Sequence, residues 1–103
     1  DGPISDATVE ELLTQDTQRA AVAVRDSVRV PLFQHQFDAL VCFVFNIGSV
    51  AFRGSTLVRL LNADDYASVS GQMWRWIYAG GEIIDGLKIR RGKEVALWKD
   101  LRI

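Results

Sequence analysis

The chain has 103 residues, of which 49% are hydrophobic and 24% charged, a composition too apolar for a disordered chain and a length that predicts one domain. Twelve lysines and arginines against thirteen aspartates and glutamates leave a net charge near −1, so no overall field draws the protein to phosphate or anionic lipid. Nucleic-acid binding is therefore disfavoured, and no apolar stretch approaches the ~20 residues of a membrane-spanning helix.

The first predicted element is a long helix from about Asp6 to Ser27. Ser5 is a suitable N-cap, and Ile4 and Val9 are spaced to form a hydrophobic staple across it. The helix must end before Val30-Pro31-Leu32, because proline lacks an N–H and disfavours helix at the residue before it.

A second helix is predicted from Gln34 to Ile47, with Gly48 ending it in the left-handed conformation. Its apolar residues surround a wide surface, so we expect a central, buried helix. Those residues are Phe37, Leu40, Val41, Val44 and Phe45. Cys42, the only cysteine, excludes an internal disulfide and is expected to be a small buried hydrophobe.

The remaining elements are shorter. Ser55 is expected to cap a helix containing Leu57, Val58, Leu60 and Leu61, and Asn62 to stop it. Asp64 to Tyr78 is predicted to be helical, followed by the turn Ala79-Gly80-Gly81, a loop or small hairpin over Glu82 to Gly86, and a final helix from Leu87 to Leu101. Gly92 weakens that helix. The sum is an all-α domain of about five helices.

Several kinds of catalytic or cofactor site are excluded. His35, the only histidine, lies near a helix start between polar neighbours and is expected to be exposed or capping. No metal-ligand spacing, serine-nucleophile motif or phosphate-binding glycine loop occurs. We therefore predict no metal and no cofactor.

Two sets of residues stand out as candidate binding elements. The first set consists of Phe45-Asn46-Ile47-Gly48, Phe52 and Gly54-Ser55-Thr56-Leu57. Its Asn46 is an amide on the last turn of an apolar helix, where satisfying a local carbonyl and facing a ligand are equally plausible roles. In the second, Trp74-Arg75-Trp76 precedes a loop that leads to Arg90 and Arg91. Aromatic faces beside arginine suit stacking on sugar rings and hydrogen bonding to their hydroxyls, although core packing of at least one tryptophan is the plainer alternative.

An ordered series of short motifs extends over nearly the whole chain. It consists of Val30-Pro31-Leu32, Gln36-Phe37-Asp38-Ala39-Leu40, Phe45-Asn46-Ile47-Gly48, Ala51-Phe52, Ser55-Thr56-Leu57, Leu60-Leu61-Asn62, Asp65-Tyr66, Arg75-Trp76, Ala79-Gly80-Gly81, Gly86-Leu87, Arg90-Arg91 and Glu94 through Ala96-Leu97. In order and spacing this series resembles the phage-type lysozymes, glycoside hydrolase family 24. The resemblance implies a lysozyme-like helical lobe, with residues 1–28 as the helix that links two lobes and residues 32–103 as the lobe itself.

Members of this family cleave the bond between N-acetylmuramic acid and N-acetylglucosamine in peptidoglycan, in a cleft between two lobes. The resemblance implies a cleft wall that contacts glycan strands through Phe45, Asn46, Gly48, Arg75, Trp76, Arg90 and Arg91. Ile89 and Val95, where many relatives carry arginine, weaken the inference about peptide contacts.

The family's catalytic segment, an early Glu-Gly followed by a hairpin and Gly-Tyr-Gly-His-Thr, is missing from this sequence. We therefore expect no catalytic residue in the chain and near-zero turnover by it alone, because that Glu is the general acid. Glu82 and Asp85 are a weak alternative acidic pair.

Two interpretations remain open. The chain is either one lobe of an intact muramidase, which the absent initiator Met favours, or a lysozyme-like binding module for peptidoglycan or a protein partner. A helical regulator that binds nucleic acid is disfavoured by charge. By resemblance the parent is made in the cytoplasm of a bacterial host and acts at the cell wall or periplasm, and no signal peptide is visible. A face left uncovered by a missing lobe predicts weak self-association.

Overall fold

The computed structural model describes residues 15–100, with side chains from residue 17, and most of that range is helical. In chain order the elements are α2 (Gln15–Ser27), α3 (Gln34–Ile47), α4 (Ser49–Arg53), α5 (Thr56–Asn62), the 3-10 helix η1 (Tyr66–Ser68), α6 (Val69–Met73), β1 (Tyr78–Ala79), β2 (Glu82–Ile83) and α7 (Asp85–Trp98). The predicted helical class is confirmed, with one small hairpin added. The predicted Ser5 cap and helix start at Asp6 lie outside the described residues.

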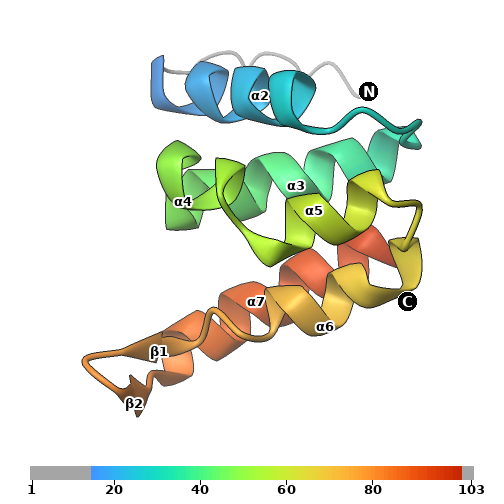
Figure 1. The fold of residues 1–103 in the computed structure, drawn as a ribbon. Coiled ribbons are helices and arrows are strands. Elements are labelled where there is room, and N and C mark those ends of the chain that lie inside the picture. The colour runs from blue at the N-terminus through green and yellow to red at the C-terminus, as the bar shows by residue number, and fades with distance from the viewer. Residues whose placement is uncertain (1–14, 101–103) are drawn as a thin grey trace, which may run out of the picture.

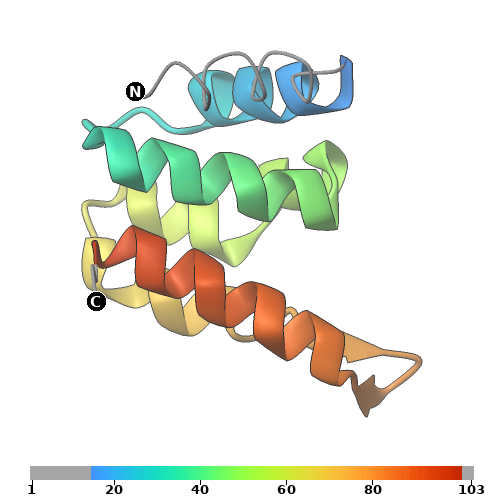
Figure 2. The same ribbon diagram turned by 180° about the vertical axis from the view of Figure 1, so that it is seen from behind.

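The helices are arranged around α3. Figures 1 and 2 show α2 along one side of α3 and α7 along the opposite side, and α3 contacts both. α5 and α6 contact each other and form a second layer behind α3 and α7 in Figure 2. α4 and the hairpin lie at the same end of the molecule, where α3 ends.

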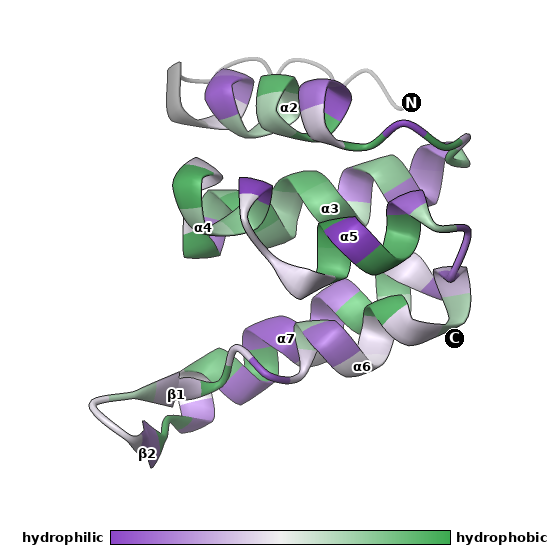
Figure 3. Ribbon diagram, in the orientation of Figure 1, coloured by the Kyte–Doolittle hydropathy of each residue, from purple (hydrophilic) through white to green (hydrophobic). Residues whose placement is uncertain are grey.

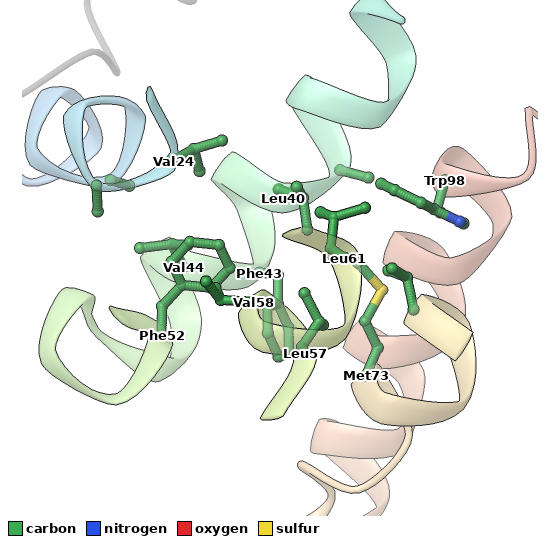
Figure 4. Close-up of a cluster of buried hydrophobic side chains, with 14 of the residues drawn as sticks. Val24, Leu40, Phe43, Val44, Phe52, Leu57, Val58, Leu61, Met73 and Trp98 are labelled. Atoms are coloured by element: carbon green, nitrogen blue, oxygen red, sulfur yellow. The ribbon is translucent and has the colours of Figure 1, made fainter. Parts of the chain in front are cut away.

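The core is one cluster of buried side chains contributed by every helix from α2 to α7. Figure 4 shows Val24 of α2, Leu40 and Phe43 of α3, Leu61 of α5 and Trp98 of α7 converging on it. Figure 3 shows α3 as more continuously hydrophobic than α2 or α7, where hydrophobic and hydrophilic residues alternate. This is the expected pattern for a central helix between two amphipathic ones.

The predicted bounds of α3 and the predicted cap of α5 are confirmed. α3 begins where the side-chain carbonyl of Gln36 accepts the N–H of Phe33, at 2.8 Å. Ser55 adopts an extended conformation, and its hydroxyl oxygen accepts the N–H of Val58 at 3.2 Å. Both helices therefore start with a local acceptor for an otherwise unpaired N–H group.

Gly48 ends α3 in a different way from the one predicted. Its φ of 96° is positive, but its ψ of 150° is extended rather than left-handed helical. The chain therefore changes direction sharply and enters the five-residue helix α4, which the sequence did not predict. A side chain at this φ would be strained, which explains the glycine.

The prediction that Asn62 stops α5 is wrong in its mechanism. The positive φ after α5 belongs to Asp64, at 70°. The Asn62 amide instead donates to the carbonyl of Ser27 at 2.8 Å and accepts the N–H of Arg29 at 2.7 Å. It therefore ties the end of α2 to α5.

The helix predicted over Asp64 to Tyr78 is too long. The carboxylate of Asp65 accepts hydrogen bonds from the backbone N–H and the hydroxyl of Ser68 and so caps the start of η1. The following helix, α6, ends at Met73. The segment after α6 leads instead into a hairpin, since Gly80 and Gly81 both have positive φ, at 61° and 83°. Two such residues form the tight turn that matches strand twist, so a hairpin is present, but it spans Tyr78 to Ile83 rather than the predicted Glu82 to Gly86.

α7 starts two residues before the predicted Leu87. A Cβ at Gly92 within it would lie 3.5 Å from Cη2 of Trp74, an ordinary van der Waals contact, so packing does not require a glycine there. The predicted burial of Cys42 is wrong: its side chain is exposed, because α3 turns the neighbouring Phe43 and Val44 inward. His35 is half-buried and its Nδ1 lies 3.0 Å from the carbonyl oxygen of Leu97, which links α3 to α7.

Candidate functional site

A groove of about 390 Å³ joins part of each of the two sets of residues singled out in the sequence. One wall comes from α4 and the turn into α5, and the other from α6 and the segment that follows it. The lining residues are Ala51, Gly54, Ser55, Thr56, Gln72, Arg75 and Trp76. Segments about twenty residues apart in the chain therefore share one open surface at the end of the molecule that carries α4 and the hairpin in Figure 1.

Ser55 fixes the first wall. Its hydroxyl donates to the carbonyl of Phe52 at 2.7 Å and accepts the N–H of Val58 at 3.2 Å. The buried ring of Phe52 anchors the same turn in the core. With Ser55 engaged in this way, the neighbouring hydroxyl of Thr56 is the one on this wall better placed for a ligand.

Trp76 dominates the second wall. Its ring is half-buried and packs edge to face on Phe43, with centroids 6.1 Å apart and planes at 83°. The backbone N–H of Trp76 donates to the carbonyl of Met73 at 3.0 Å, and its backbone carbonyl accepts from Nη1 of Arg91 at 3.1 Å. Arg75 beside it is exposed. A packed indole next to an exposed guanidinium thus lines the groove.

Arg91 lies behind this wall and not in it. The side chain is 1% exposed, and its Nε and Nη2 lie 2.6 Å and 2.9 Å from the two carboxylate oxygens of Glu94. Burial raises the pKa of Glu94, with Arg91 opposing the shift. The resemblance implied that Arg91 contacts substrate, but a buried guanidinium cannot reach one.

Phe45 and Gly48 line a second, smaller hollow of about 280 Å³, together with Arg19, Ala20, Val44 and Ser49. Ser49 and Ala51 of α4 thus line different hollows, so the structure does not bring Phe45 and Trp76 into one groove. The amide of Asn46 is exposed and donates to the carbonyl of Cys42 at 3.0 Å. This is the local-carbonyl role that the sequence left as one of two alternatives.

Arg90 is exposed on α7 and lines neither hollow. Glu82 and Asp85, the alternative acidic pair, are also exposed, so neither lies in an apolar enclosure of the kind that surrounds a general acid. Sequence reasoning missed Gln72 as a lining residue. Its amide gives no periodic or motif signal, and only the packing of α6 beside α5 brings it to the same groove as Thr56.

The groove combines an indole ring with guanidinium, amide and hydroxyl groups. Aromatic rings stack on the apolar faces of sugars, while the polar groups donate to and accept from sugar hydroxyls. An open groove with this lining suits a chain of sugars better than a small enclosed ligand.

Comparison with known proteins identifies the relationship. The family model described as Phage lysozyme matches residues 1–94. The chain belongs to the phage lysozyme family. The membership predicted from the ordered motifs is thereby confirmed, and so is the lysozyme-like helical fold.

Individual members of the phage lysozyme family agree with this assignment. The SAR-endolysin of Escherichia phage Mu is 45% identical over 94 residues, which are 91% of this chain and 55% of that protein. The endolysin of Bacillus phage B103 is 37% identical over 95 residues, 92% of this chain and 36% of that protein. The solved muramidase domain of SpmX from Asticaccaulis excentricus matches with a TM-score of 0.78 and 35% identity, covering 90% of this chain and 65% of that one.

This member of the phage lysozyme family therefore spans about half of the phage Mu relative and about a third of the phage B103 relative. Within residues 15–100, no helix is both long and apolar enough to cross a bilayer.

Proposed function

We propose that this chain is the helical, glycan-binding part of a peptidoglycan-cleaving lysozyme, with the Trp76 groove as its main binding surface. The single observation that carries the proposal is the groove itself: residues of two family motifs, Ser55-Thr56 and Arg75-Trp76, line one open surface. Membership of the phage lysozyme family supports a bacterial cell-wall substrate and action at the cell wall.

Contacts with the substrate are divided among the lining groups. The Trp76 ring stacks on one sugar, and Arg75, Gln72 and Thr56 hydrogen-bond to hydroxyl, acetamido or carboxylate groups of the strand. The hollow at Phe45 and Gly48, across α4, binds a neighbouring part of the same substrate. Arg90, exposed on α7, provides a further positive charge for the peptide stems.

The chain does not supply the proton donor in this proposal. A general acid must lie within hydrogen-bond reach of the glycosidic oxygen and hold its proton near neutral pH. Glu94 has a raised pKa, but it is 4% exposed and paired with Arg91 beneath the groove. The acid of the complete enzyme therefore comes from outside residues 15–100.

Binding is tested by co-sedimentation of the purified chain with insoluble peptidoglycan. Trp76→Ala is expected to weaken binding about tenfold or more, because loss of one stacked aromatic removes roughly 1–3 kcal/mol. Trp74→Ala is the matched control, since Trp74 is partly exposed but lies outside the groove lining. If the two variants bind equally well, the groove is not the binding surface.

Catalysis is tested separately, by following the turbidity of a bacterial cell-wall suspension. The chain alone is expected to bind the walls without clearing them. Clearing by the purified chain would contradict the assignment of the proton donor to another segment. If the chain neither binds nor clears the walls, a protein partner becomes the better interpretation of the surface.

A further inference from the structure

The buried ion pair between Arg91 and Glu94 is not explained by a contribution to the stability of the fold. Two charged side chains, 1% and 4% exposed, form a two-pronged ion pair inside the core. Removing such groups from water costs several kcal/mol, and well-packed apolar side chains in their place are often equally stable or more so. We therefore looked for a role of the pair other than stabilising the packing of the helices.

That role is indicated by the hydrogen bond that the guanidinium donates outside the ion pair. Nη1 of Arg91 donates to the carbonyl of Trp76 at 3.1 Å, across fifteen positions of sequence. Trp76 lies between α6 and β1, where its peptide is outside both helix and strand. The buried arginine thus holds the backbone of the segment that carries the groove's main aromatic ring.

Arg91 also supports the ring through Phe43. Its guanidinium carbon lies 5.2 Å from the centroid of Phe43, in a cation–π contact. Phe43 in turn meets the Trp76 ring edge to face at 6.1 Å. Both the backbone and the indole of Trp76 are therefore fixed from beneath by groups that touch Arg91.

Only an arginine can make this set of contacts. Its planar guanidinium places Nε and Nη2 against the two carboxylate oxygens of Glu94, with a hydrogen bond from Nη2, and donates from Nη1 to the carbonyl of Trp76. A lysine is a single charged point without this fork, and it does not stack in the same way on an aromatic face. Glu94 completes the arrangement by holding the fork in one orientation and neutralising it.

We propose that Arg91, oriented by Glu94, is a positioning residue that sets the Trp76 wall of the groove without touching the glycan. This inference rests on the proposed function for its effect on binding. The structural effect on Trp76 is independent of that function, and the two can be measured separately.

The first variant is the double substitution Arg91→Met with Glu94→Leu, which removes the pair without leaving a buried unpaired charge. Arg91→Lys is the second, since it keeps a positive partner for Glu94 but loses the fork. Lys93→Met, at an exposed position of the same helix that lines neither hollow, is the matched control. Denaturant unfolding establishes which variants retain the parent's stability, and those are compared further.

Two measurements follow on these proteins. In peptidoglycan co-sedimentation, the double variant and Arg91→Lys are expected to bind about tenfold more weakly, because a displaced wall weakens several contacts together. In ¹H–¹⁵N spectra, the indole N–H signal of Trp76 is expected to shift or broaden while that of Trp98 stays in place. A purely structural role would weaken stability without this selective change at Trp76.

The outcomes separate the two proposals. Unchanged Trp76 signals in both Arg91 variants overturn the positioning role, whatever happens to binding. Shifted signals with unchanged affinity also overturn it as a determinant of the groove. If the parent chain itself fails to bind peptidoglycan, the proposed function falls, and the Trp76 signal still decides whether Arg91 positions that ring.

Discussion

Replacing Asn62 by alanine tests how α2 is attached to the rest of the fold. Its amide donates to the Ser27 carbonyl at 2.8 Å, in a part-buried bond, and accepts the Arg29 N–H at 2.7 Å, in an exposed one. A net hydrogen bond contributes about 0.5–1.5 kcal/mol, so losing both should cost about 1–2 kcal/mol. At this chain length that corresponds to a Tm lower by roughly 4–8 °C per kcal/mol.

The assay is urea unfolding followed by circular dichroism, with the slope m expected to stay constant. Asn46→Ala is the matched control: its exposed amide makes one bond to Cys42, within its own helix, and should cost about 0.5 kcal/mol or less. Asn62→Asp, which retains the acceptor for Arg29 but loses the donor to Ser27, should fall between the two. Equal losses for the two alanine variants would refute the bridging role of Asn62.

Three further outcomes are expected. The pKa of the Cys42 thiol is raised by partial desolvation of its sulfur and by the negative charges of Glu94 and Asp38. At pH 8, iodoacetamide should therefore alkylate the folded chain more slowly than the urea-unfolded chain, and equal rates would contradict this. Leu61→Ala, at a fully buried side chain, should cost about 2–5 kcal/mol of unfolding free energy, and Leu97→Ala, at a partly exposed one, much less. Gly81→Ala should strain the hairpin by about 1 kcal/mol and speed amide exchange of Ile84, which bonds across it, about fivefold; unchanged exchange would disprove the strain.

Local signals in the sequence predicted the parts of the fold that local chemistry determines. Pro31 and Gly48 bracket α3, Ser55 caps α5, and the Gly80-Gly81 pair forms the hairpin turn. In each case one residue type satisfies a backbone requirement within a few positions of itself. Such features can be predicted from the local sequence without knowing what packs around them.

The errors arose where distant packing decides. Arg90 and Arg91 are adjacent, but a helix turns about 100° per residue, so one faces solvent and the other the core. Which of the two arginines is buried depends on contacts with Trp76 and Phe43, which lie in other parts of the chain. Cys42 was misplaced for the same reason, because an apolar helix does not reveal which side its neighbours cover.

The candidate site was predicted in part. The structure places Arg75 and Trp76 at one open surface, and their contact with glycan stays a prediction. That Thr56 and Gln72 line the same groove could not be predicted from the sequence, because it depends on how α5 packs against α6. Phe45 was grouped with them by resemblance, but it lies at a separate hollow across α4.

The most direct test of the central claim is a titration of the ¹⁵N-labelled chain with a soluble peptidoglycan tetrasaccharide, followed through its amide and indole signals. We predict the largest shifts at Gly54, Thr56, Gln72 and Trp76, the residues that line the groove. Shifts confined to Phe33 and its surroundings, at the opposite end of α3, or no shifts at saturating glycan, would contradict the account.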